Sequence, residues 1–258
     1  MIPSVFHFAY YRGTKNFVWR DIHTLCLRSC RANTGIANIV VHYDAPGAGT
    51  HWDEARALPG IEWRLTDFAA TINGYDVTDQ RIICDMYRLR TLEREGGFFA
   101  DLDFVFLGSF ESLRHNEALI GTQCRAKKKL ACGLMGCVPG AAFIRAYIAA
   151  YDNWTPKEQI KFWNYANSVP WALSSIHPVT VVPRPAFYPW CWSNRKFLAG
   201  APINIKTAIA IHLWESLHQD LTVDVLKTTV IGPAIAKVQG QPAPSPVAVM
   251  PGRTLTFE

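Results

Sequence analysis

Residues 82–103 read IICDMYRLRTLEREGGFFADLD, and this stretch indicates the fold because it joins a helix to a strand. Its first half repeats apolar side chains every three or four residues, which predicts a helix over residues 78–95 with Thr78 as the N-cap. The glycine pair at 96–97 ends this helix, since glycine adopts the left-handed conformation without a Cβ penalty. The aromatic run over residues 98–107 then predicts a buried strand.

Two carboxylates, Asp101 and Asp103, interrupt that expected strand. Charged side chains are costly inside a sheet, so their presence needs an explanation. Residues i and i+2 project from one face of a strand about 6.5 Å apart, so both carboxylates can converge on one cation while Leu102 packs on the other face. Oxygen ligands suit Mg²⁺ or Mn²⁺, and such an ion recruits phosphate groups. The alternative is a D-x-D tripeptide that ends a strand in solvent.

Asp85 and Arg88 lie three residues apart on the expected helix. This spacing places both side chains on one face, beside the apolar stripe, where they can point at a ligand. The alternative is an exposed ion pair, which contributes little to stability.

The chain before this stretch alternates expected strands and helices, which predicts β-α-β units and therefore parallel strands. The expected elements are strands over residues 2–11, 37–43 and 61–65, a helix over residues 17–31 and a loop over residues 44–60.

The chain after it continues the same α/β pattern and closes on a tail that contains four prolines. The pattern predicts strands over residues 118–122, 130–137, 179–182 and 208–214, and helices over residues 141–151 and 156–166. His212 and Trp214 would share one face of the last strand and could reach into the same cleft. We expect one catalytic domain over residues 1–238 and an extended tail over residues 239–258.

The composition is that of a folded domain with no sign of nucleic-acid binding. The 258 residues are 49% hydrophobic and 18% charged, which excludes disorder, and the net charge of +5 is too small to indicate a nucleic-acid partner. We expect no transmembrane segment, because proline, glycine and arginine interrupt the longest apolar run. No signal peptide is visible, so a cytoplasmic protein is expected, with peripheral membrane association left open. Seven cysteines without a C-x-x-C pair predict reduced, mostly buried thiols.

The residues described above resemble glycosyltransferases with a DXD sugar-binding region, family 32 and its relatives. The family signature is Asp-x-x-Arg on a helix, followed by Gly-Gly-x-Tyr-x-Asp-x-Asp, and residues 85–103 are similar to it. Residues 5–10 look like the family's Ile-His-x-x-Trp strand, and residues 211–214 look like its closing His-x-Trp. The resemblance implies a GT-A-like nucleotide-binding fold of the α/β class, with a mixed, mainly parallel central sheet flanked by helices.

The resemblance also implies roles for the matched residues. Asp101 and Asp103 would bind Mn²⁺ or Mg²⁺, Asp85 would bind hydroxyl groups of the donor sugar, and Arg88 would contact that sugar or its phosphate. Donor contacts would further come from Tyr10, at the place of a Trp that contacts the nucleotide base, from Phe99 and from Trp214.

Four details depart from the family pattern or leave a role open. Phe99 stands where the family has Tyr, so a hydroxyl contact is lost, and Tyr10 replaces Trp but still offers a ring for stacking. Residues 130–136 contain no counterpart of an Asn that holds the donor sugar in relatives. His212 could complete the metal site or contact the diphosphate, with Glu215 as the competing ligand.

The function implied by the resemblance is a metal-dependent glycosyltransferase of the hexosyltransferase class. It would use a nucleotide sugar, with UDP favoured over GDP, and transfer the sugar with retention to a glycan or another hydroxyl acceptor. Two alternatives remain: an inactive relative or carbohydrate-binding module, and a metal-dependent phosphohydrolase or nucleotidyltransferase. The latter enzymes usually need further carboxylates or histidines for a second metal.

Overall fold

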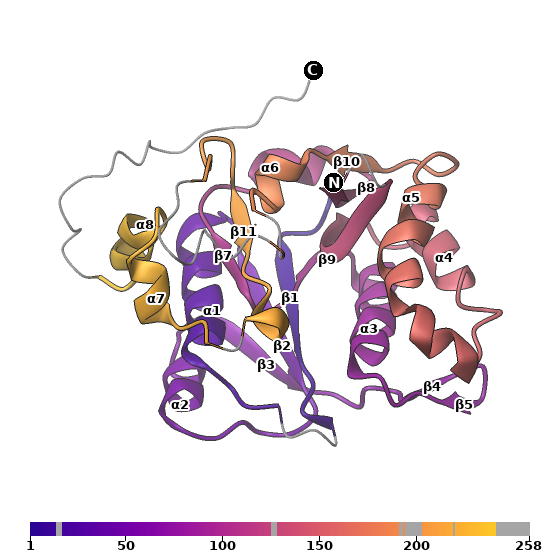
Figure 1. Ribbon diagram of the computed structural model, residues 1–258, viewed down its shortest axis with the longest axis horizontal. Helices are drawn as coiled ribbons and strands as arrows, with labels where there is room; N and C mark the ends of the chain where they lie inside the picture. Colours follow the sequence, from indigo (N-terminus) through magenta and orange to yellow (C-terminus); the bar gives the residue numbers. More distant parts are fainter. Residues whose placement is uncertain (14–16, 125–127, 191–192, 194–202, 219, 241–258) are drawn as a thin grey trace.

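The computed structural model describes residues 1–13, 17–124, 128–190, 193, 203–218 and 220–240, and shows an α/β fold (Figure 1). The strands are β1 (Val5–Tyr10), β2 (Asn38–Tyr43), β3 (Ile61–Leu65), β4 (Thr71–Ile72), β5 (Tyr75–Asp76), β6 (Gly97–Ala100), β7 (Phe104–Phe106), β8 (Ala118–Cys124), β9 (Lys129–Cys137), β10 (Thr180–Val182) and β11 (Ala210–His212). The α-helices are α1 (Asp21–Asn33), α2 (Thr50–Arg56), α3 (Gln80–Glu95), α4 (Ala142–Ala149), α5 (Val169–Leu173), α6 (Arg184–Phe187), α7 (Val223–Lys227) and α8 (Gly232–Val238). Shorter 3₁₀ turns are η2 (Glu111–His115), η3 (Pro156–Lys161) and η6 (Glu215–Leu217), and η4 (Asn164–Ser168) is a π-helical turn.

The central sheet has seven strands in the order β10-β8-β9-β6-β1-β2-β3. All neighbouring strands are parallel except those that pair with β9, which runs antiparallel to β6 and to β8. A second, two-stranded sheet pairs β7 with β11 in antiparallel register. The expected mixed, mainly parallel sheet is confirmed.

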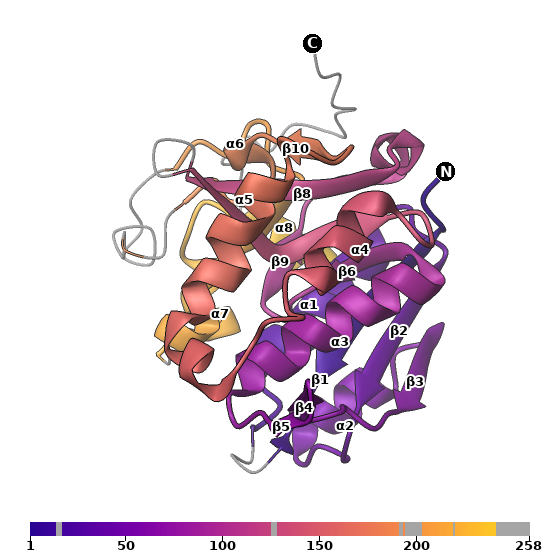
Figure 2. The same ribbon diagram turned by 90° about the vertical axis from the view of Figure 1, so that its right-hand side faces the viewer.

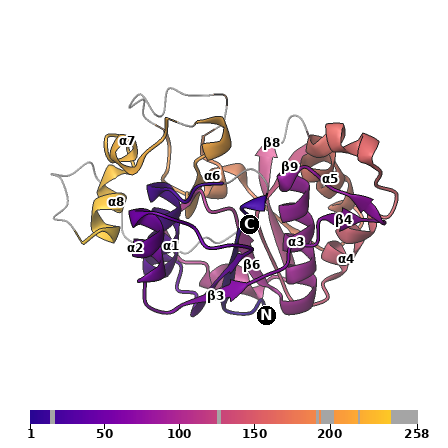
Figure 3. The same cartoon turned by 90° about the horizontal axis from the view of Figure 1, so that it is seen from below.

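Helices cover both faces of this sheet (Figures 2 and 3). On β1 and β6, alternate side chains enter opposite cores: Phe6 and Phe98 pack toward α1, whereas Phe99 packs toward α3. Figure 3 shows α1, α2, α7 and α8 on one side and α3, α4 and α5 on the other. The period of two along each strand therefore builds two cores from one sheet.

Helix α3 ends where the glycine pair predicts. Gly96 and Gly97 have φ values of 67° and 89°, and a Cβ on Gly97 would lie 2.8 Å from the carbonyl oxygen of Val5. Glycine is required here both for the conformation and for the close approach of β1.

Several expected boundaries are wrong. The first helix begins at Asp21 instead of residue 17, and the expected loop over residues 44–60 contains helix α2. The expected helix over residues 156–166 is a 3₁₀ turn followed by a π-helical turn. The expected tail lies mostly outside the described residues.

Two further expectations concern the bilayer and the thiols. Within the described residues, no helix combines the length and the hydropathy needed to cross a membrane. The described free thiols are Cys26, Cys30, Cys84, Cys132 and Cys137. Cys26, Cys30 and Cys137 are buried, and the other two are partly buried.

Candidate active site

The D-x-D aspartates lie in a turn between β6 and β7, at the carboxyl end of the central sheet. The expectation of one strand over residues 98–107 is wrong at its centre, because β6 ends at Ala100 and β7 begins at Phe104. The backbone N–H of Asp101 donates to the carbonyl oxygen of Gly133 at 2.9 Å, which ties the turn to β9. The two carboxylates therefore converge through the geometry of a turn and not through a shared strand face.

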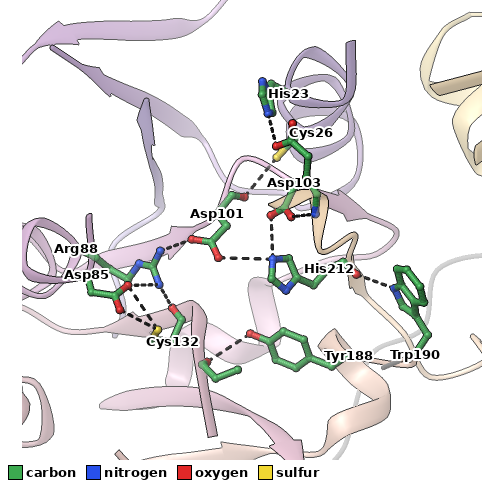
Figure 4. A network of polar contacts seen from close by, with 12 residues as sticks. His23, Cys26, Asp85, Arg88, Asp101, Asp103, Cys132, Tyr188, Trp190 and His212 are labelled. Carbon is green, nitrogen blue, oxygen red and sulfur yellow. Dashed lines mark hydrogen bonds and ion pairs between the residues drawn. The ribbon is translucent and has the colours of Figure 1, made fainter. Parts of the chain in front are cut away.

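One oxygen of each carboxylate accepts a hydrogen bond from a neighbouring group, and the other oxygen faces His212 (Figure 4). Arg88 donates to Oδ1 of Asp101, while Oδ2 lies 3.5 Å from Nε2 of His212. Oδ2 of Asp103 accepts from the backbone N–H of Glu215 at 2.8 Å, and Oδ1 lies 2.9 Å from the same imidazole nitrogen. One atom of each of the three side chains lies within 4.8 Å of the others, so they could hold a metal ion.

His212 reaches this point because β11 pairs with β7 and places it opposite Phe104. The two rings are stacked with centroids 4.5 Å apart, and the Trp214 ring lies 4.1 Å from the imidazole. The expectation that His212 and Trp214 share a strand face is wrong, since β11 ends at His212 and Trp214 has a φ of 59°. The left-handed residue turns the indole back onto the imidazole.

In this cluster the imidazole and the carboxylates each stabilise the charged form of the other. Burial lowers the pKa of His212, but Asp103 and Asp101 raise it more, so that it lies above its ordinary value. Burial raises the pKa of Asp103, but His212 and the backbone N–H of Glu215 together lower it more, so that it lies below its ordinary value and the carboxyl stays ionised. A proton and a cation would compete for the same imidazole nitrogen.

Asp85 and Arg88 form a second, adjacent pair on α3. Both are buried, at 6% and 3% exposure, so the alternative of an exposed ion pair does not apply. Their closest side-chain atoms lie 3.4 Å apart, and Arg88 also donates to the carbonyl oxygen of Cys132. Burial raises the pKa of Asp85 to about 6, against the opposing effect of Arg88. Burial lowers the pKa of Arg88, but Asp101 and Asp85 raise it more, so this side chain remains charged.

Gly133 leaves space for the Asp101 carboxylate. A Cβ at this position would lie 2.8 Å from Oδ2 of Asp101 and 3.6 Å from Cε1 of His212. The missing Cβ of Gly133 therefore leaves room beside Asp101 and His212, two of the three side chains whose ligand atoms converge. This observation fits a bound ion.

Glu215, the competing ligand in the sequence, is engaged elsewhere. Its carboxylate accepts from Nη1 of Arg20 at 2.9 Å and lies 2.8 Å from Nε2 of His23. Both partners stand at the start of α1, so Glu215 fixes the segment after β11 to that helix. This segment contains Trp214, whose buried indole N–H has no hydrogen-bond acceptor among the described residues.

Of the three aromatic residues expected to contact the donor, the structure brings Phe99 and Trp214 to the pocket and not Tyr10. The Phe99 ring faces the guanidinium of Arg88 at 5.3 Å. Tyr10 is 1% exposed and donates its hydroxyl hydrogen to the carbonyl oxygen of Phe17 at 2.8 Å, so it is a core residue. Its neighbour Tyr11 lines the pocket instead.

A pocket of about 280 Å³ joins these features. It is lined by seven of the eight residues expected from the sequence: Asp85, Arg88, Phe99, Asp101, Asp103, His212 and Trp214. It also has lining residues that the sequence did not single out: Gln80, Arg81, Cys132, Phe162, Trp163 and Asn167. Gln80 and Arg81 precede Asp85 on one helix, so the helical period could have found them, whereas the last three come from a segment with no recognisable motif.

No known protein-family model and no curated protein matches this sequence. Solved structures do match. The PaToxG glycosyltransferase is 18% identical, with a TM-score of 0.50 over 68% of this chain and 69% of that chain. The galactosyltransferase LgtC, solved with donor and acceptor sugar analogues, is 14% identical, with a TM-score of 0.46 over 81% of this chain and 86% of that chain.

A third solved structure, the bifunctional glycosyltransferase WbbM, is 11% identical, with a TM-score of 0.48. The match covers 93% of this chain and 52% of that chain. At these identities the likeness concerns the fold alone. The likeness to the PaToxG structure, at a TM-score of 0.50, is consistent with the mixed α/β sheet and flanking helices of a GT-A-like fold.

Proposed function

We propose that this chain is a metal-dependent glycosyltransferase that transfers a sugar from a nucleotide sugar to a hydroxyl group of a glycan. The observation that carries the proposal is the convergence of Asp101, Asp103 and His212 within 4.8 Å, at the carboxyl end of β6 in a GT-A-like sheet. The adjacent Asp85–Arg88 pair adds a buried carboxylate and a fixed cation to the same pocket.

The proposed ion is Mn²⁺ or Mg²⁺, held by Asp101, Asp103 and His212. When bound, it neutralises negative charge on the diphosphate of the donor. Arg88 holds Asp101, and the N–H of Glu215 holds Asp103, so both carboxylates are oriented before the donor arrives. Preoriented charges stabilise a transition state without a further reorganisation cost.

Arg88 acts in this proposal mainly through the carboxylates that it positions. Its two terminal nitrogens already contact Asp101, Asp85 and the carbonyl oxygen of Cys132. Asp85 then accepts hydrogen bonds from hydroxyl groups of the donor sugar. We favour UDP over GDP as the nucleotide.

Transfer breaks the bond between the anomeric carbon and the diphosphate oxygen, and the electron pair leaves with the diphosphate. The oxygen of the acceptor hydroxyl bonds to that carbon, and its proton passes to the leaving phosphate oxygen. Attack on the side of the leaving group gives retention. In this proposal the indole N–H of Trp214, which has no acceptor among the described residues, donates to the departing diphosphate.

The alternatives are less well supported by the site. A two-metal hydrolase needs two neighbouring ligand sets, whereas the described residues contain one such group. A carbohydrate-binding module has no need of buried, mutually oriented carboxylates, which are costly to desolvate.

The test is donor cleavage. Purified protein is incubated with a panel of UDP- and GDP-sugars, with Mn²⁺ or with EDTA, and released nucleotide is quantified. We expect Mn²⁺-dependent release from one donor, lost in Asp103→Asn and kept in Asp224→Asn, whose carboxylate is exposed on α7. No release from any donor would count against the proposal.

A further inference from the structure

The mouth of the pocket carries a feature that donor chemistry does not use. Arg81, Phe162 and Trp163, here called the aromatic rim, line the pocket together. Trp163 is 48% exposed, although large aromatic side chains are usually buried. An exposed indole at the opening of a pocket is available to a ligand.

Helix α3 sets the distance between the rim and the donor contacts. Arg81 precedes Asp85 by four residues and Arg88 by seven, so all three lie on one side of the helix. With a rise of about 1.5 Å per residue, Arg81 lies about 6 Å from Asp85 along the axis. The rim is therefore one helical turn outward from the carboxylate proposed to bind the donor sugar.

Contacts among its own side chains and with Asp79 hold the aromatic rim in place. The guanidinium of Arg81 is held by Asp79 at 2.6 Å and stacks on the Phe162 ring at 4.3 Å, with the Trp163 ring at 5.7 Å. The two rings meet edge to face with centroids 4.9 Å apart. These contacts orient the indole while leaving about half of it open.

A π-helical turn places the rim beside α3. The N–H of Val169 bonds to the carbonyl oxygen of Asn164, five residues back, and Pro170 lacks the N–H that an α-helix would use. Asn167 in this turn donates to the carbonyl oxygen of Leu130 at 2.7 Å, which anchors the segment to β9. Figures 1 and 2 both show the segment that leads into α5 standing beside α3.

The polar groups next to the rim are uncharged amides. Gln80 precedes Arg81 on α3, Asn167 lies in the turn after Trp163, and both line the pocket together with Gln123. Arg81 is paired with Asp79. Aromatic faces combined with a few neutral donors and acceptors suit an uncharged polar ring, because its apolar face can pack on an indole while its hydroxyls meet amides. A charged ligand would find no unpaired partner among these described lining residues.

We propose that the aromatic rim is an acceptor subsite that binds the uncharged pyranose ring of the glycan to be extended, with the ring packed on Trp163. This inference rests on the proposed function, since it names the acceptor of that reaction. It makes Trp163 a specificity residue for the acceptor and leaves the donor to the inner part of the pocket.

Saturation-transfer NMR tests the subsite directly. The probes are methyl glucoside, galactoside, mannoside and N-acetylglucosaminide, each with protein, UDP and Mn²⁺. We expect saturation of one pyranoside, lost in Trp163→Ala, retained in part in Trp163→Phe and unchanged in Tyr75→Ala, an exposed aromatic outside the pocket lining. Pyranoside binding that survives Trp163→Ala, or binding of a Ser- or Tyr-containing tripeptide in place of all pyranosides, would overturn the proposal.

Kinetics separates this inference from the proposed function. With the pyranoside as acceptor, Trp163→Ala should lower kcat/KM for transfer at least about tenfold while donor hydrolysis in water stays within about twofold. An equal loss of both activities would assign the rim to the donor and overturn the acceptor subsite. Absence of donor hydrolysis in the wild type would count against the proposed function, while the NMR experiment would still decide the subsite.

Discussion

The structure buries histidines at two places along its sheet, and their pKa values shift in opposite directions. His212 on β11 faces Asp101 and Asp103 at the carboxyl end of the central sheet, and its pKa is raised. His7 and His42 lie within 3.1 Å of each other on β1 and β2, and burial lowers their pKa values to about 4 and about 3.

The difference lies in the neighbours, because all three side chains are buried. His42 contacts the hydroxyl of Tyr87 at 2.8 Å and the His7 ring, neither of which carries a negative charge. His212 faces two carboxylates. Burial alone lowers the pKa of a histidine and favours its neutral form. A raised pKa in a buried histidine indicates nearby carboxylates, as expected at a site that binds a cation.

Replacing His212 should have the largest effect. His212→Gln removes the imidazole that faces both aspartates, so Mn²⁺-dependent donor cleavage should fall at least about 100-fold. The measurement is released nucleotide over a range of Mn²⁺ concentrations. His51→Gln, an exposed histidine on α2, is the control, and equal activity of the two variants would contradict a role of His212 in the site.

Asp85→Asn should separate function from stability. Loss of the carboxylate should lower donor cleavage about 100-fold. The pKa of Asp85, about 6, lies above its ordinary value, so the folded state binds the proton more readily and the free energy of unfolding falls as pH rises from 4 to 6. The free energy of unfolding of the variant should therefore be about 3 kcal/mol higher at pH 8.

Urea denaturation at pH 8 and at pH 4 measures this difference. The gain should fall below about 1 kcal/mol at pH 4, where Asp85 is protonated in the folded state and about half protonated in the unfolded chain, whose ordinary pKa is 3.8. A variant that is destabilised equally at both pH values would show that the carboxylate stabilises the fold.

The His7–His42 pair should make the protein sensitive to acid. Their pKa values in the folded state lie below the ordinary 6.5, so the unfolded chain binds more protons and stability falls as pH drops from about 6.5 toward 4. We expect a loss of about 1 to 2 kcal/mol per histidine between pH 6.5 and pH 5. The double variant His7→Phe, His42→Leu should flatten this dependence in urea denaturation, and an unchanged slope would assign the acid sensitivity to other groups.

Tyr87→Phe should have the smallest effect. It removes the hydroxyl partner of His42 and should cost about 1 kcal/mol of unfolding free energy. Donor cleavage should stay unchanged, because Tyr87 does not line the pocket. A large loss of activity would mean that the two histidine clusters are coupled.

Much of the fold follows from local sequence signals. The third expected strand, residues 61–65, is reproduced in full as β3, and the glycine pair correctly ended α3. These signals are strong because both the apolar periodicity and the preference of glycine for the left-handed conformation depend only on residues close together in the chain. The strand expected over residues 98–107 failed because its two aspartates leave the sheet for a turn, and pattern alone could not distinguish a strand face from a turn.

The site was predictable where residues follow one another closely. Asp85, Arg88, Asp101 and Asp103 lie within 19 positions, and the structure brings them to one pocket. Asn167 lies in a π-helical turn and Trp163 directly precedes it, and this turn has no period that the sequence reveals, so both residues were missed. Tyr10 was misplaced since strand alternation turns it toward the α1 side, while Tyr11 faces the pocket.

The most direct test of the central claim is the affinity of UDP for the protein with and without a metal ion, measured by isothermal titration calorimetry. We expect Mn²⁺ to tighten UDP binding at least about tenfold relative to EDTA in the wild type and in Asp224→Asn, but not in Asp103→Asn. Equal UDP affinity with Mn²⁺ and with EDTA in the wild type would contradict a metal site at Asp101, Asp103 and His212.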